Sequence, residues 1–74
     1  MDFQELKQRA KCAWQTQYRE ALDCIDTLAG SVVTGRAYSK LLTIEETISE
    51  LTGNMISESD FDQWRDEVRK ERGE

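Results

Sequence analysis

The side chains that could do chemistry in this chain are mainly carboxylates, and most of them lie in its C-terminal part. Positions 43–74 hold ten acidic and four basic groups, whereas positions 1–42 hold five acidic and six basic groups. Carboxylates gathered on a small protein attract a basic partner, and a string of them can imitate nucleic-acid phosphates. The alternative is a solvated surface, because acids near residue 58 and bases near residue 70 also suit the macrodipole of a helix between them.

The sequence offers little support for catalysis or cofactor binding. It contains no histidine and no glycine-rich phosphate loop, and Cys12 and Cys24 are its only thiols. Both cysteines fall on one predicted helix, about 18 Å apart along its axis, so they cannot form a disulfide with each other. Two thiols without histidine are also too few for a closed zinc site. We therefore expect no enzyme activity, no cofactor and no metal, and two reduced, mostly buried cysteines.

The chain shows no sign of export or of membrane insertion. No apolar run approaches the roughly 20 residues of a membrane span, and the first residues lack the apolar core of a signal peptide. Unpaired thiols fit a reducing compartment. We expect a cytoplasmic protein without membrane contact; chains this small and acidic are frequent among phage and mobile-element products.

A long amphipathic helix over about residues 3–29 is the element against which the rest must pack. Asp2 can cap its start, apolar side chains return at helical spacing, and Gly30 is the expected left-handed stop. The apolar face spans close to half the circumference, more than one neighbouring helix needs. Its second neighbour is either another helix of this chain or another subunit. We expect a homodimer, with self-association through Trp14, Tyr18, Leu22 and Ile25.

A second helix is predicted over about residues 32–52. Its apolar residues recur at every third or fourth position without interruption. We expect two of them, Leu41 and Ile48, to face the first helix. Because the connection is short, the two helices should form an antiparallel hairpin. A competing interpretation starts this helix at Thr43, where Thr43 and Glu46 have the form of a capping box, and leaves residues 31–42 as a loop.

A short third helix is predicted over about residues 58–72. Ser57 and Asp60 form a capping box, Ile56 and Phe61 occupy the positions of a hydrophobic staple, and Gly73 ends the run. The expected fold is therefore all-α, a single domain over residues 1–74 in which a long hairpin is followed by a short helix.

These features favour a small regulator, adaptor or inhibitor that acts by binding another protein. The acidic half supplies charge for steering, and off-stripe or lightly anchored aromatic and aliphatic side chains could serve as anchors. The residues we expect at the partner-binding surface are Tyr38, Leu42, Glu58, Asp62, Trp64 and Asp66.

The alternative function is nucleic-acid binding by a regulator. The segment 43–65 resembles the second and third helices of helix-turn-helix modules, although its last helix would aim carboxylates at phosphates. Basic and aromatic side chains also interleave along the first helix in a way that can bind a nucleic-acid strand. That row consists of Lys7, Lys11, Trp14 and Tyr18.

Overall fold

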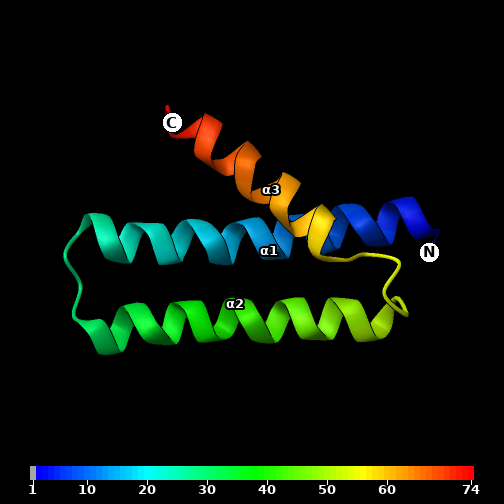
Figure 1. Ribbon diagram of the computed structural model, residues 1–74, viewed down its shortest axis with the longest axis horizontal. Coiled ribbons are helices and arrows are strands. Elements are labelled where there is room, and N and C mark those ends of the chain that lie inside the picture. Colours follow the sequence, from blue (N-terminus) through cyan, green and yellow to red (C-terminus); the bar gives the residue numbers. More distant parts are fainter. Residues whose placement is uncertain (1) are drawn as a thin grey trace.

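The structure, a computed structural model, describes residues 2–74 as three α-helices, without a strand in that range (Figure 1). The helices are α1 (Phe3–Asp26), α2 (Ser31–Leu51) and α3 (Glu58–Glu71). The all-α prediction is confirmed, and every predicted helix boundary lies within three residues of the observed one.

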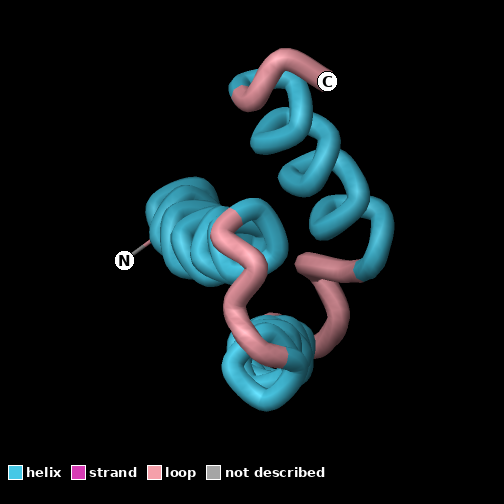
Figure 2. The backbone as a smooth tube through the Cα atoms, turned by 90° about the vertical axis from the view of Figure 1, so that its left-hand side faces the viewer, coloured by secondary structure: helices cyan, strands magenta, loops and turns pink. Residues whose placement is uncertain are grey.

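Helix α1 is the element that both other helices pack against. α1 and α2 lie side by side, and the chain reverses direction between them at the turn 27–30 (Figure 1). Viewed along the axes of these two helices, α3 begins beside both of them and then extends away from α2 (Figure 2). The start of α3 is therefore the part of this helix that comes nearest to α2.

Helix α2 is continuous across the region where the sequence allowed two interpretations. The interpretation with a start at Thr43 is wrong, because the Thr43 hydroxyl donates to the Ser39 carbonyl at 3.1 Å within the helix. A mid-helix threonine satisfies its hydroxyl in this way instead of capping. Leu41 and Ile48 are buried, as predicted for the face toward the core.

The turn between α1 and α2 does not use glycine as predicted. Leu28 takes the left-handed conformation with φ of 56°, whereas Gly30 has φ of −58° and is the N-cap of α2. The Ala29 N–H donates to the Cys24 carbonyl at 2.8 Å, so the left-handed stop of α1 falls at Leu28, two residues earlier than the predicted Gly30. Gly53 and Gly73 do adopt positive φ after α2 and α3, as expected of helix stops.

Trp14 of α1 is the centre of the hydrophobic core and is fully buried. Its ring stacks on Tyr18 at a centroid distance of 5.1 Å and on Phe61 at 6.1 Å, and it lies 6.2 Å from Trp64. The indole N–H donates to Glu45 of α2 at 3.0 Å. The buried cluster around it consists of Tyr18, Leu41, Ile48, Ile56, Phe61, Trp64 and Val68.

The start of α3 is held by the predicted capping box of Ser57 and Asp60. The Ser57 N–H donates to Asp60 Oδ2 at 3.0 Å, and this bond is the main reason that the pKa of Asp60 lies below its ordinary value of 3.8. Burial opposes the shift, and the Lys7 ammonium at 3.2 Å adds to it. Because the folded state lowers this pKa, Asp60 stabilises the fold above pH 4 and ceases to do so as the pH falls below that value.

Asp60→Asn should therefore destabilise the protein at pH 7 by on the order of 1 kcal/mol, since a charge-assisted hydrogen bond becomes a neutral one. As the pH falls through the lowered pKa of Asp60, its carboxylate becomes neutral, so the two unfolding free energies should approach each other. Urea unfolding followed by circular dichroism between pH 7 and pH 2 measures the difference. The control Asp66→Asn changes an exposed carboxylate, and its curve should follow that of the wild type. A constant gap between Asp60→Asn and wild type at all pH values would contradict the assignment.

Candidate functional site

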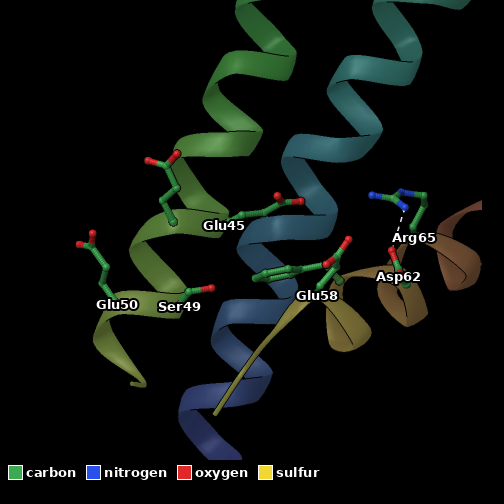
Figure 3. Close-up of a pocket in the computed structure, with 8 residues that line it drawn as sticks. Glu45, Ser49, Glu50, Glu58, Asp62 and Arg65 are labelled. Carbon is green, nitrogen blue, oxygen red and sulfur yellow. Dashed lines mark hydrogen bonds and ion pairs between the residues drawn. The ribbon is translucent and has the colours of Figure 1, made fainter. Parts of the chain in front are cut away.

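An open groove of about 460 Å³ lies between the second half of α2 and the start of α3 (Figure 3). Five of its eight lining side chains are carboxylates, and a single arginine is present. The lining residues are Glu45, Glu46, Ser49 and Glu50 from α2, and Glu58, Phe61, Asp62 and Arg65 from α3.

The packing of the core determines how the groove is built. Phe61 is 6% exposed and stacks on Trp14, so it contributes an apolar floor. Glu45 turns toward α1, where its carboxylate accepts from the Trp14 indole, whereas Glu50 points away from α1 (Figure 3). On the α3 side, Arg65 pairs with Asp62 at 3.0 Å. The groove therefore combines a small apolar floor with an acidic wall on each side.

Ion pairs between α1 and α3 neutralise many of the carboxylates outside the groove. Lys11 pairs with Glu67 at 2.9 Å and Arg19 with Glu71 at 2.8 Å; the second pair lowers the pKa of Glu71. Toward the C-terminal end of α1 the carboxylates lie on α1 instead: Arg72, the C-cap of α3, donates to two of them, Asp23 and Asp26.

Within residues 2–74, four carboxylates of the groove make no ion pair: Glu45, whose only side-chain partner is the neutral Trp14 indole, and Glu46, Glu50 and Glu58. The negative charge that the chain does not neutralise internally is therefore concentrated at the groove. A cationic ligand placed there would reduce the repulsion between these like charges.

The residues expected at a partner-binding surface have different locations in the structure. Glu58 and Asp62 line the groove, and Leu42, which is 59% exposed, lies about one helical turn before Glu45 on α2. Tyr38 is half-buried against the core.

Two other residues of that expected surface lie outside the groove. Trp64 is buried at 3% exposure and so is not available as an anchor for a partner. Its backbone carbonyl and the Glu67 carboxylate accept hydrogen bonds from buried Gln15. Asp66 is exposed but does not line the groove.

The residues expected to mediate self-association are largely covered within the single chain. Trp14 and Tyr18 are buried under α3, Leu22 is half-buried, and Ile25 is half exposed. The wide apolar face of α1 thus has α2 and α3 as its two neighbours. The reason for placing a second subunit on Trp14 and Tyr18 is removed, because α3 occupies that position.

The basic and aromatic row along α1 does not present free cations to a nucleic acid. Lys7 pairs with Asp60 and Lys11 with Glu67, while Trp14 and Tyr18 belong to the core. A smaller hollow of about 190 Å³ beside these lysines is lined mainly by polar side chains. The first turns of α3, which would enter a groove of DNA, carry acidic Glu58, Asp60 and Asp62.

Sequence reasoning did not identify the α2 wall of the groove or its apolar floor. Glu45 and Glu50 have no individual role in the sequence-based prediction, Glu46 appears there only in the competing capping box with Thr43, and Phe61 appears only in the hydrophobic staple. The signal that was present is the spacing of Glu46 and Glu50, which places two carboxylates on one helix face.

Other kinds of site and comparisons with known proteins give no further indication of function. Residues 2–74 contain no group of three or more potential metal ligands, and no described helix has the length and apolar character of a membrane span. Both cysteines are free, but Cys12 is exposed, so the prediction of burial is wrong for that residue. The chain matches no protein-family model, no curated protein and no solved structure.

Proposed function

We propose that this chain is a small regulator, adaptor or inhibitor that binds another protein by holding a basic segment of that partner in the groove between α2 and α3. The observation that carries the proposal is the groove itself, where Glu45, Glu46, Glu50 and Glu58 remain without an ion pair inside the described chain. Several carboxylates outside the groove are instead paired with cations across α1 and α3, such as Glu67 with Lys11 and Glu71 with Arg19. Charge complementarity therefore points to lysine and arginine side chains as the ligands.

The expected occupant is an amphipathic helix or short basic segment with at least one apolar side chain. Its cations would contact the carboxylates of both walls, and its apolar side chain would contact Phe61 or the exposed Leu42 at the end of the groove. Carboxylates would accelerate association, whereas desolvated apolar contacts would slow dissociation. We propose binding without catalysis, and a cytoplasmic location, which the two free cysteines support.

A defined probe tests the groove without knowledge of the natural partner. An amphipathic helical peptide of lysine, arginine and leucine should shift the backbone amide resonances of Ser49, Phe61 and Arg65 in a nitrogen-15 NMR titration. Binding should weaken about tenfold in Glu58→Gln/Asp62→Asn, which removes two carboxylates from the groove. The matched control Glu20→Gln/Asp66→Asn removes the same charge from exposed positions outside it.

The proposal fails if both double variants weaken peptide binding equally, because the peptide would then respond to net charge alone. It also fails if the largest shifts fall on residues outside the groove. Circular dichroism of each variant must show unchanged helicity, since Glu58 and Asp62 also lie near the N-terminus of α3, where carboxylates favour the helix.

A further inference from the structure

The outer face of α2, opposite the core, carries charges in an order that does not stabilise this helix. Arg36 and Lys40 lie in its N-terminal half and Glu46 and Glu50 in its C-terminal half, which is the reverse of what the macrodipole favours. Each like-charged pair is also four residues apart, a spacing at which like charges repel. In the described chain none of the four side chains makes an ion pair.

The same four charges are complementary to those of a second copy. Thr43 lies at the midpoint of the face, with Arg36 and Glu50 each seven residues away and Lys40 and Glu46 each three residues away. If two α2 helices pack antiparallel with their Thr43 residues together, Arg36 of one helix lies opposite Glu50 of the other. Lys40 of one helix likewise lies opposite Glu46 of the other. A parallel arrangement would instead place like charges opposite each other.

Exposed apolar side chains are also concentrated on and around α2. All seven large hydrophobic residues that are exposed in the described chain lie between positions 25 and 55, on α2, in the turns at its two ends, or, for Ile25, in the last turn of α1. One group lies at the N-terminal end of α2 and another at its C-terminal end, so an antiparallel copy would bring the unlike ends together. The residues are Ile25, Leu28, Val32 and Val33 at the first end, Leu42 near the middle, and Leu51 and Met55 at the second end.

We infer that a second copy of this chain docks on the outer face of α2, in an antiparallel homodimer whose two-fold axis passes close to Thr43. The Arg36 of each copy then pairs with Glu50 of the other, and Lys40 lies near Glu46. The apolar groups at the ends are buried together. This interface differs from the face of α1 that includes Trp14, which α3 already covers.

The dimer can be tested by charge reversal on either side of Thr43. Glu46→Lys/Glu50→Lys raises the net charge of the chain from −5 by four units to −1, so general electrostatic repulsion between copies falls. The proposed interface nevertheless predicts weaker association, with a dimer dissociation constant raised about tenfold or more, because cations would face cations. The control Glu20→Lys/Asp66→Lys has the same net charge and should dimerise at least as well as the wild type.

A mixing experiment makes the test specific. Arg36→Glu/Lys40→Glu should also be monomeric by analytical ultracentrifugation, but an equimolar mixture with Glu46→Lys/Glu50→Lys should form a heterodimer. Both reversals suit the macrodipole of α2, so the variants should keep their helicity. Three results would overturn the inference: a wild type that stays monomeric at millimolar concentration, reversals that dimerise like the wild type, or a mixture that remains monomeric. Glu46 and Glu50 also line the groove, but the groove variants at Glu58 and Asp62 leave the four charges of this face intact, so peptide binding and dimerisation can fail independently.

Discussion

Trp14→Ala is expected to remove about 3–5 kcal/mol of unfolding free energy, the usual range for a buried tryptophan. A domain this small has a total stability of only about 5 kcal/mol, so the variant should be largely unfolded at room temperature. The physical reason is that Trp14 is fully buried and contacts aromatic rings from both α1 and α3. Urea unfolding followed by far-ultraviolet circular dichroism measures the loss.

Trp14→Phe separates the packing of this residue from its hydrogen bond. The phenyl ring keeps much of the aromatic contact but cannot donate to Glu45, so the cost should be clearly smaller, about 1–3 kcal/mol. A Trp14→Ala protein that unfolds at the same urea concentration as the wild type would show that α3 does not cover this side chain.

The second large effect on stability is expected at Leu41 of α2, and the adjacent Leu42 serves as its control. Leu41→Ala should cost about 2–5 kcal/mol, because Leu41 is 5% exposed and belongs to the core cluster. Leu42→Ala removes the same atoms from a side chain that is 59% exposed, and should change stability by no more than about 0.5 kcal/mol. Thermal or urea unfolding of both variants gives the comparison.

A difference of less than about 1 kcal/mol between the two leucine variants would contradict the orientation of α2. Because the substitutions are chemically identical and neighbouring, their difference does not depend on helix propensity. It reports only on which side of α2 faces the core.

The helices could be predicted from sequence because their signals are local. The stripe through Leu41 and Ile48 repeats at helical spacing, and the capping box of Ser57 and Asp60 lies within four consecutive residues. Such patterns are determined by backbone geometry and do not require knowledge of distant contacts. The exchange of roles between Leu28 and Gly30 was not predictable in this way, since a non-glycine residue rarely adopts positive φ.

The covering of α1 by α3 could not be predicted, because it depends on contacts across the whole chain. The wide apolar face that includes Trp14 and Tyr18 required two neighbours, but periodicity does not distinguish a helix of the same chain from a second subunit. The deciding interactions join residues about fifty positions apart, such as Tyr18 with Arg69 at 3.0 Å and Arg19 with Glu71. No local pattern encodes such pairs.

The groove was only half predictable for the same reason. Glu58 and Asp62 stood out as acidic residues at a helix start, but their position opposite Glu45 and Ser49 depends on how the turn 52–57 directs α3. In that turn Gly53 and Asn54 both have positive φ, and the Thr52 hydroxyl accepts from the Ile56 N–H at 3.2 Å. These details set the angle at which α3 leaves α2 and hence the shape of the site.

The most direct test of partner binding is to identify what lies in the groove inside cells that produce the protein. A photoreactive phenylalanine analogue at Ser49 should crosslink to one segment of a partner, rich in lysine and arginine, which mass spectrometry of the crosslinked peptide identifies. The crosslink should disappear with Glu58→Gln/Asp62→Asn and persist with Glu20→Gln/Asp66→Asn. The same analogue at exposed Gln63, outside the groove, is the positional control. Crosslinks at Ser49 that go only to another copy of this chain would contradict the binding of a separate partner in the groove. Crosslinks that match those from Gln63, or that do not depend on Glu58 and Asp62, would contradict it as well.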